Sequence, residues 1–309
     1  MTTVPARSAS LRDVTLRDGL QLVGKAIPLE RKLEIVRVLL DIGVPEIEIG
    51  SLARPDLVPA MADTLDLVAE LTTEERKRCW LWVATPRHVE QAAAAGAVNF
   101  QYCLSVSNSH NQANIGRDTE DSIAAMPAAI EIADSVGGRM QLCLATAFTC
   151  PFDGPVDPYC TLDIIADPRT YGSHDIVLCD TLGQAIPSEV DSLVRKSRAL
   201  APQRRLVFHG HDTWGMGVAN TLAAINAGVD LVDGALGGLG GCPFAPGASG
   251  NTSTEDILFA TRPDYLDPSA FQRLVGVSEQ LLSELSEEPR SRAAQGARSR
   301  AHSFPWVID

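Results

Sequence analysis

The chain has 309 residues, a formal charge of −13 at pH 7 and 45% hydrophobic residues. This length allows either one large α/β domain or two ordinary domains. No basic footprint indicates a nucleic-acid partner, and no apolar run approaches the roughly eighteen residues of a membrane span. The N-terminal residues lack the apolar segment of a secretory signal. We therefore expect a cytoplasmic protein without a nucleic-acid or membrane partner.

The seven cysteines are irregularly spaced and form no CxxC motif. This pattern argues against a disulfide framework and against a zinc ribbon. Most of the cysteines lie in apolar runs, where we expect small buried side chains.

Predicted strands and helices alternate along the chain. Apolar runs predict strands near residues 11–16, 44–49, 79–84, 98–105, 140–146, 174–179, 205–210 and 229–234. Amphipathic segments predict helices near residues 29–42, 56–70, 86–95, 119–136, 161–168, 187–199, 215–227 and 254–260. Strands that alternate with helices indicate a parallel sheet covered by helices. About eight such units in roughly 250 residues predict an α/β protein with a (β/α)8 TIM barrel. An open doubly wound sheet is the alternative, although no GxGxxG motif follows the first strand.

The residues after the eighth unit divide into an apolar and a polar segment. Residues 264–285 carry apolar side chains at helical spacing, so we predict one or two further helices that cap the barrel. Residues 1–285 would then form a single catalytic domain. Residues 286–309 are polar and rich in Arg, Ala and Ser, and we expect a mobile tail there. Its Phe304-Pro305-Trp306 segment could dock on the domain.

Polar residues gather where the predicted strands end. The active site of a TIM barrel lies at the C-terminal ends of its strands, so these residues are the candidates for chemistry. They are Arg17, Asp18 and Gln21; Glu48 and Ser51; Asn108 and His110; Asp180 and Thr181; His209 and His211; and Asn251, beyond a glycine-rich stretch.

His209-Gly210-His211 is the most informative of these segments. Residues i and i+2 of a strand point to the same face, so both imidazoles can reach one cation. With Asp18 they form an oxygen and nitrogen ligand set without thiolate, to which Asn251 could add an amide oxygen. This set suits Mg²⁺ or Mn²⁺, and zinc and iron(II) are compatible with it. The alternatives are two solvated histidines at a strand end and a turn-forming Asp18 before Gly19.

Two further residues would carry chemistry beside such a metal. Arg17 is either a surface charge or a fixed cation that stabilises a developing oxyanion. Cys242 lies in the glycine-rich stretch 237–250, which lacks the GK[ST] ending of a P-loop. We interpret that stretch as a lid that brings the thiol to the substrate, with a free buried thiol as the alternative.

Together, these motifs resemble the 3-hydroxy-3-methylglutaryl-CoA (HMG-CoA) lyases, within a wider group of metal-dependent barrel lyases and condensing synthases. The resemblance covers about residues 11–285. The matching segments are Leu16–Gln21, Glu46–Ser51, Val58–Asp63, Cys150–Gly154, Cys179–Gly183, HGHDTWGMGVANTLAAINAG from His209 and GGLGGCPFAPGASGNTSTED from Gly237. The last two are the most specific.

The resemblance implies a role for each candidate residue. Asp18, His209, His211 and Asn251 would hold the divalent metal. Arg17 would stabilise the substrate carbonyl or enolate, and Cys242 would be the acid/base thiol. Glu48 would orient Arg17 or the ligands. The substrate pocket would be lined by Gln21, Ser51, Asp180, Thr181 and Asn108.

The reaction implied by the resemblance is a retro-aldol cleavage of an acyl-CoA, most simply of HMG-CoA to acetyl-CoA and acetoacetate. The chain departs from the family near the expected pocket mouth, with Leu22-Val23 in place of a polar pair and Asn108 in place of an acidic residue. These departures leave open a lyase of a related hydroxyacyl-CoA. The motifs are also compatible with a condensing synthase that uses acetyl-CoA and a 2-oxo acid, and with a metal-binding barrel without turnover. A homodimer is also left open.

Overall fold

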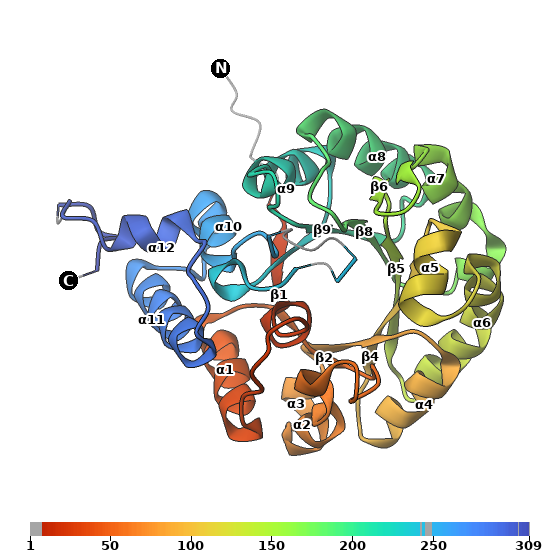
Figure 1. The fold of residues 1–309 in the computed structure, drawn as a ribbon, viewed down its shortest axis with the longest axis horizontal. Coiled ribbons are helices and arrows are strands. Elements are labelled where there is room, and N and C mark those ends of the chain that lie inside the picture. The colour runs from red at the N-terminus through yellow and green to blue at the C-terminus, as the bar shows by residue number, and fades with distance from the viewer. Residues whose placement is uncertain (1–7, 242, 245–248, 302, 309) are drawn as a thin grey trace.

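The computed structural model describes residues 8–241, 243–244, 249–301 and 303–308. Eight parallel strands close into a barrel in the order β1-β10-β9-β8-β5-β4-β3-β2, with helices around it (Figure 1). The predicted TIM barrel is confirmed, and the open sheet is excluded. The strands are β1 Ser10–Asp13, β2 Glu46–Ser51, β3 Cys79–Val83, β4 Asn99–Ser105, β5 Arg139–Ala145, β8 Asp175–Asp180, β9 Arg205–Gly210 and β10 Leu231–Gly234, and a small hairpin comprises β6 Thr149–Cys150 and β7 Gly154–Pro155.

Half of the helices α1–α10 begin at a side-chain cap. For example, Thr85 and Ser253 accept hydrogen bonds from backbone amides in the first turns of their helices. None of the helices in the described ranges is both long and apolar enough to cross a membrane. Their bounds are α1 Leu29–Ile42, α2 Thr64–Glu70, α3 Thr73–Arg76, α4 Pro86–Ala94, α5 Asn108–Ile115, α6 Thr119–Ser135, α7 Pro158–Ala166, α8 Pro187–Leu200, α9 Gly217–Ala227 and α10 Thr254–Thr261, with short 3₁₀ turns at Pro59–Met61, Pro168–Thr170 and Leu236–Gly238.

Several helical segments differ from their predictions, among them the segment 56–70 and α5. The helix expected over 56–70 is instead a 3₁₀ turn at Pro59–Met61 followed by α2, because Pro59 lacks an amide hydrogen and restricts the residue before it. Helix α5 was not predicted. Its residues are mostly polar and have no apolar stripe that would reveal an amphipathic helix.

The first strand ends earlier than its apolar run suggested. Strand β1 stops at Asp13, and Thr15–Gly19 form a π-helical turn that carries Arg17 and Asp18. The Asp13 carboxylate holds this turn, because it accepts hydrogen bonds from the Thr15 amide at 3.0 Å and from the Thr254 hydroxyl at 2.7 Å. Single π-helical turns recur at functional sites in proteins.

A buried polar network fills part of the barrel interior. The guanidinium of Arg12 pairs with both oxygens of Asp233, at 2.9 and 2.7 Å, and also donates to Gln141. Gln141 in turn donates to Asp175, which Arg205 holds through two further hydrogen bonds. Burial opposes charge on Asp233, but Arg12 and a hydrogen bond from His209 lower the pKa of this carboxyl below its ordinary value. The network therefore links β1, β8, β9 and β10 through charged groups, and β5 through the neutral amide of Gln141.

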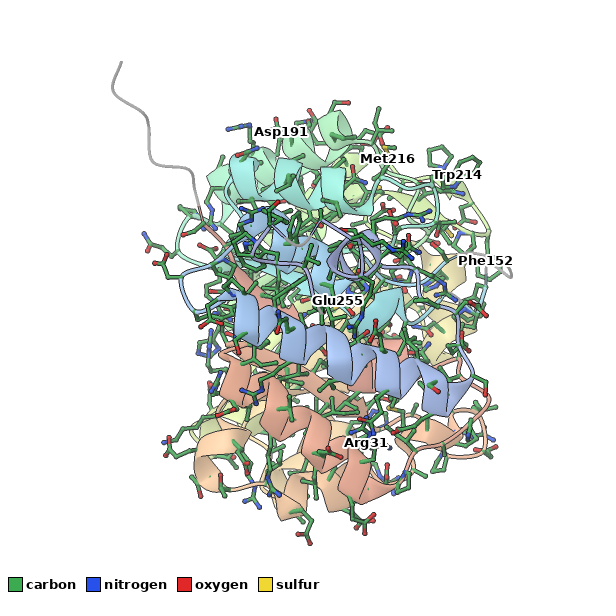
Figure 2. All side chains as sticks on the ribbon, turned by 90° about the vertical axis from the view of Figure 1, so that its left-hand side faces the viewer. Arg31, Phe152, Asp191, Trp214, Met216 and Glu255 are labelled. Carbon is green, nitrogen blue, oxygen red and sulfur yellow. The ribbon has the colours of Figure 1, made fainter. Side chains whose placement is uncertain are left out.

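The last two helices lie beside the barrel. Helix α11, Pro268–Leu285, contacts α1, and α12, Arg292–Ala297, contacts α10. Figure 2 shows α11 crossing this side of the molecule above Arg31 of α1. The Arg31 guanidinium donates to Glu284 of α11 at 3.0 Å. The predicted helix within 264–285 is therefore present.

Residues 286–309 were expected to form a mobile tail, but the described part of this segment is packed against the domain. Asp256 accepts hydrogen bonds from the Ser291 hydroxyl and the Ala293 amide, and so fixes the start of α12. Trp306 packs edge-on against Phe259 and Phe271, with ring centroids 6.0 and 5.4 Å apart. The docking of the Phe304-Pro305-Trp306 segment, which the sequence left open, is therefore observed for Trp306, whereas the polar composition did not reveal α12.

The Arg12–Asp233 pair generates a stability prediction. Arg12→Met would leave the Asp233 carboxylate buried without its cation, so we expect the free energy of unfolding to fall by about 3–5 kcal/mol. The control is Arg195→Met, which breaks an exposed ion pair with Asp191 and should leave stability nearly unchanged. Urea unfolding followed by circular dichroism measures both variants. Equal stability of Arg12→Met and the unchanged protein would contradict a structural role for the pair.

Candidate active site

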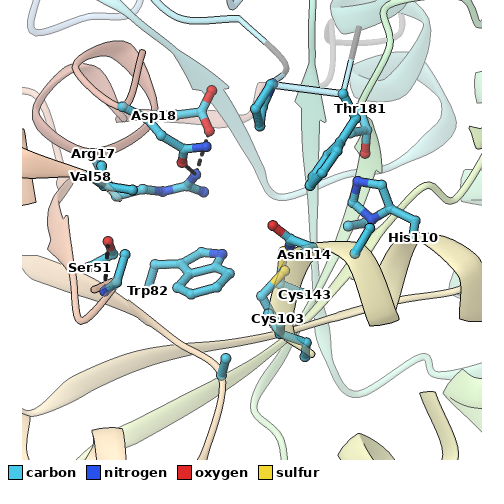
Figure 3. A pocket seen from close by; sticks show the side chains of 18 of the residues that line it. Arg17, Asp18, Ser51, Val58, Trp82, Cys103, His110, Asn114, Cys143 and Thr181 are labelled. Atoms are coloured by element: carbon cyan, nitrogen blue, oxygen red, sulfur yellow. Dashed lines mark hydrogen bonds and ion pairs between the residues drawn. The ribbon is translucent and has the colours of Figure 1, made fainter. Parts of the chain in front are cut away.

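One cavity of about 550 Å³ opens at the C-terminal ends of the strands, where the sequence analysis placed the active site. Its open end is lined by exposed residues of the β2–α2 connection and of α5, including Arg54, Leu57 and Gln112. Its inner part is lined by Arg17, Asp18, Gln21, Ser51, Trp82, Cys103, His110, Cys143, Cys179, Thr181, His209 and His211. Figure 3 shows Arg17 and Asp18 on one side of the cavity and His110 and Thr181 on the other.

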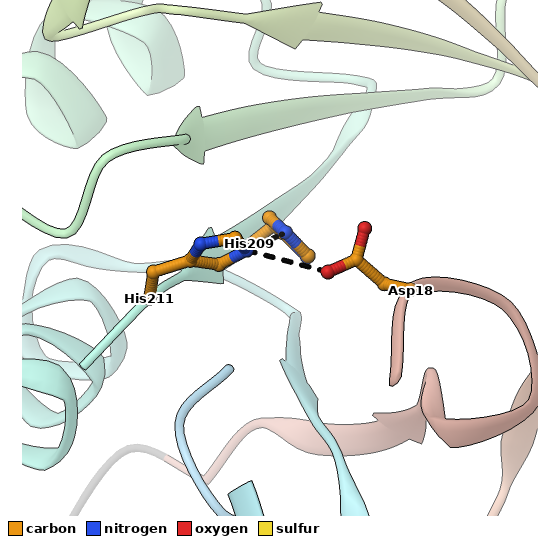
Figure 4. A group of neighbouring side chains, drawn as sticks. All are labelled: Asp18, His209 and His211. Carbon is orange, nitrogen blue, oxygen red and sulfur yellow. Dashed lines mark hydrogen bonds and ion pairs between the residues drawn. The ribbon is translucent and has the colours of Figure 1, made fainter. Parts of the chain in front are cut away.

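Asp18, His209 and His211 converge at the inner end of the cavity. All three are buried, and they can offer ligand atoms within 4.8 Å of one another. The two histidine Nε2 atoms lie 3.3 Å apart, and His211 Nε2 lies 3.3 Å from Asp18 Oδ2. Figure 4 shows the two rings and the carboxylate turned toward one another. The i, i+2 spacing at the end of β9 therefore brings both imidazoles together with the carboxylate of the π-helical turn.

The charges around this cluster favour a bound cation. Burial would raise the pKa of Asp18, but the charge of Arg17 and the hydrogen bond from His211 lower it below the usual range of a carboxyl. Burial also opposes a charge on His209, yet Asp233 and Asp18 raise the pKa of this imidazole. The carboxylates of Asp18 and Asp233 therefore favour a positive charge at the position that the Nε2 atoms of the two histidines face.

Asn251 lies beside the cluster, with its amide nitrogen toward Asp18 and its amide oxygen without a partner. Its Nδ2 donates to Asp18 Oδ2 at 2.8 Å and to the Leu239 carbonyl at 3.0 Å. Its Oδ1 is buried and has no hydrogen-bond partner among the described residues. A buried carbonyl oxygen without a partner is costly, and a divalent cation would satisfy it. The residues present therefore fit a metal held by oxygen and nitrogen ligands.

Asp233 orients His209 from behind. The Asp233 Oδ2 atom lies 3.1 Å from His209 Nδ1, which leaves Nε2 directed at the cluster. A metal-binding histidine commonly donates its other ring N–H to a carboxylate in this way. Asp233 was not among the site residues predicted from the sequence. Its position one residue before Gly234, at the end of the eighth strand, was the available signal.

Arg17 is held by neighbours on three sides. Its Nε donates to Glu48 at 2.6 Å, its Nη1 donates to Asp18, and its guanidinium lies 6.0 Å from the centre of the Trp82 ring. Gln101 donates to the other oxygen of Glu48 at 2.7 Å. The Nη2 atom of Arg17 has no partner among the described residues, so it is available to a substrate oxygen. Glu48 thus contacts Arg17 and lies outside the metal cluster.

The five residues expected to line the substrate pocket divide into two groups. Gln21, Ser51 and Thr181 line the cavity. Asp180 does not line the cavity. Its carboxylate accepts hydrogen bonds from the backbone amides of Gln184 and Ala185 and so holds the turn after β8. Asn108 is exposed outside the cavity lining, and its amide bonds with Asp118 and the Thr119 amide at the start of α6. These two residues therefore have structural contacts in this structure, and their contacts with a substrate stay predictions.

Cys242 lies outside the described residues. Its neighbours Gly241, Pro243 and Phe244 line the cavity, so this stretch borders the candidate site. Gly240 adopts a φ of +114°, and a Cβ atom there would lie 2.6 Å from Asn251 Nδ2. Only glycine lets the backbone pass this close to the candidate ligands. The close approach of the backbone to the candidate ligands therefore requires glycine at position 240.

Comparison with known proteins identifies the family. A family model described as HMGL-like matches residues 9–279. The chain is 36% identical to an (R)-citramalyl-CoA lyase of Chloroflexus aurantiacus, over 81% of this chain and 82% of that protein. It is 31% identical to a hydroxymethylglutaryl-CoA lyase of Bacillus subtilis, over 82% and 85% of the two chains.

The solved structures agree with these sequence relatives. The structure of an HMG-CoA lyase from Acinetobacter baumannii, in complex with coenzyme A and 3-methylmalate, superposes with a TM-score of 0.87. It is 30% identical and covers 97% of this chain and 98% of its own. An HMG-CoA lyase of Pseudomonas aeruginosa gives a TM-score of 0.86 at 28% identity, with coverage of 96% and 99%. The resemblance inferred from the motifs is confirmed, and the chain belongs to the HMGL-like family of lyases.

Proposed function

We propose that this protein catalyses a divalent-metal-dependent retro-aldol cleavage of a 3-hydroxy-3-methylacyl-CoA, with HMG-CoA as the first candidate. The products would be acetyl-CoA and acetoacetate. The observation that carries the proposal is the convergence of Asp18, His209 and His211 beside Arg17 in one cavity. The relatives named as acyl-CoA lyases support the substrate class.

The metal site would be formed by Asp18, His209 and His211, with the amide oxygen of Asn251 as a fourth ligand. These oxygen and nitrogen ligands suit Mg²⁺ or Mn²⁺. When bound, such an ion would polarise the tertiary hydroxyl of the substrate and make it easier to deprotonate. Asp233 would keep His209 in the orientation that this role requires.

Arg17 and Cys242 would act on the other half of the substrate. As the hydroxyl loses its proton, the C–C bond breaks and leaves a ketone and a thioester enolate. The free Nη2 of Arg17 would stabilise the enolate oxygen, and Glu48 would hold the guanidinium in place. Cys242 would then donate a proton to the enolate carbon to give acetyl-CoA. Water in the open cavity would take up the hydroxyl proton and return a proton to the Cys242 thiolate, so the net reaction consumes no other reactant.

Citramalyl-CoA is the second candidate substrate. The 36% identity to an (R)-citramalyl-CoA lyase favours it, and the same chemistry would yield acetyl-CoA and pyruvate. A condensing synthase would instead release free CoA from acetyl-CoA and a 2-oxo acid.

The choice of reaction is tested by incubating the purified protein with HMG-CoA or with citramalyl-CoA, in the presence of Mg²⁺ or Mn²⁺. We expect acetyl-CoA to form from at least one of these two thioesters, and EDTA to abolish its formation. Chromatography of the CoA esters, with detection of acetoacetate or pyruvate, identifies the substrate. Failure to cleave either thioester with metal bound would contradict the proposal, and release of free CoA from acetyl-CoA and pyruvate would support the synthase.

The metal ligands are tested by His211→Ala. We expect this variant to lose both bound Mn²⁺ and activity, because one of the converging nitrogen ligands is removed. His174→Ala is a matched control, since His174 is exposed and precedes β8 at the other end of the barrel. Electron paramagnetic resonance of Mn²⁺ titrations measures binding. Unchanged Mn²⁺ affinity in His211→Ala would rule out this ligand set.

The role of Cys242 is tested by Cys242→Ser. We expect Mn²⁺ affinity to be retained and kcat to fall by about 10²–10⁴-fold, the usual contribution of an acid/base group. Cys160→Ser, at an exposed position on α7, is the matched control and should keep full activity. Loss of metal together with activity in Cys242→Ser would argue against a proton-donating role.

A further inference from the structure

His110 lines the candidate active-site cavity but takes no part in the proposed retro-aldol cleavage. It lies on α5, just beyond the end of β4, and only 3% of its surface is exposed. Its ring packs against Phe244 and Phe152, with centroids 5.0 and 6.3 Å away. Figure 3 places it across the cavity from Arg17. A buried imidazole that faces a substrate cavity has one ring nitrogen to offer a ligand.

The hydrogen bond to Ser105 determines which nitrogen this is. Ser105 Oγ lies 2.6 Å from His110 Nδ1, and the hydroxyl has no other partner among the described residues. Ser105 is fully buried, so its proton would be left unpaired unless it were donated to Nδ1. Nδ1 is then the acceptor, and the ring proton resides on Nε2. The Nε2 atom has no partner in the described part of the chain.

The ring is a neutral donor. Burial lowers the pKa of His110 to about 4, so the imidazole carries no charge at neutral pH. No carboxylate forms an ion pair with it among the described residues. A neutral N–H suits a neutral carbonyl oxygen. It can share the thioester oxygen with Arg17, whose charge would stabilise that oxygen from the other side of the cavity once it becomes the enolate oxygen.

The position of His110 along the cavity indicates which carbonyl group of the substrate it would contact. Residues Gln112–Gly116 of the same helical segment line the open end, whereas Cys143 and His209 line the inner end. The CoA chain would enter through the open end, and the hydroxyacyl group would lie at Asp18, His209 and His211. The thioester joins these two parts of the substrate.

We propose that His110 is a substrate-binding residue whose Nε2–H donates a hydrogen bond to the thioester carbonyl oxygen of the acyl-CoA. This inference rests on the proposed acyl-CoA substrate but does not depend on which acyl group is cleaved. Ser105 is then a positioning residue, because its hydroxyl fixes the tautomer that makes Nε2 a donor.

The test compares the binding of acetyl-CoA with that of S-ethyl-CoA, a thioether that lacks the carbonyl oxygen. In the presence of Mg²⁺, we expect the unchanged protein to bind acetyl-CoA at least about threefold more tightly, as a neutral hydrogen bond allows. His110→Phe keeps the packing of the ring but removes both nitrogens. It should bind the two ligands equally, with its affinity for S-ethyl-CoA within about twofold of the unchanged protein. Isothermal titration calorimetry measures all four affinities.

Three further variants make the test specific. His110→Gln retains a side-chain N–H donor and should keep most of the preference for acetyl-CoA. Ser105→Ala leaves the ring in place and should reduce the preference, and it tests the same interaction if His110→Phe fails to fold. His174→Phe, a histidine replacement at the other end of the barrel, should leave the preference unchanged.

The outcomes separate this inference from the proposed reaction. If His110→Phe or Ser105→Ala keeps the full preference, or if His110→Phe weakens both ligands equally, the carbonyl contact is refuted. If the unchanged protein binds neither ligand, the acyl-CoA substrate and the role of His110 both fail. If His110 determines the preference but neither HMG-CoA nor citramalyl-CoA is cleaved, the contact stands and the reaction must be revised.

Discussion

The pairing of the buried Asp233 carboxylate with Arg12 and His209 is the interaction on which the rest of the molecule depends. It pairs with Arg12 of β1 inside the barrel and lies 3.1 Å from the Nδ1 atom of His209 on β9. Barrel closure makes this arrangement available, because β10 lies between β1 and β9. A buried carboxylate is tolerated only when it is paired. The same contacts that neutralise it also orient a candidate metal ligand, so stability and function share one network.

The candidate site combines rigid strand ends with residues on unusual backbone. His209 lies on β9, and His211 directly follows Gly210, where that strand ends. Arg17 and Asp18 lie on a π-helical turn, and Gly240 passes close to Asn251 with a positive φ. These local departures bring Arg17, the candidate metal ligands and the residues that flank Cys242 to one cavity. The regular barrel determines where the cavity lies, and the irregular turns position many of the candidate functional residues that line it.

The alternation of apolar runs and amphipathic helices was enough to predict the barrel, because parallel strands buried on both faces are apolar along their length. The histidine spacing was enough to predict the pairing of His209 with His211. The sequence could not show that Asp180 and Asn108 form hydrogen bonds with nearby backbone. Substrate binding and the stabilisation of a turn use the same polar side chains. Asp233 and Trp82 were missed, because their importance depends on contacts between distant strands and turns. The hydrogen bond between Ser105 and His110 was not predicted either, although His110 was among the candidate residues.

The central claim is that Asp18, His209 and His211 hold one catalytic divalent ion. A crystal structure grown with Mn²⁺ and measured at the manganese absorption edge tests it most directly. We predict one anomalous peak within about 2.5 Å of Asp18 Oδ2 and of the Nε2 atoms of His209 and His211, which is the range of metal–ligand distances in proteins. The Asn251 amide oxygen should complete the protein ligands. A peak elsewhere in the molecule, or none at saturating Mn²⁺, would contradict the account.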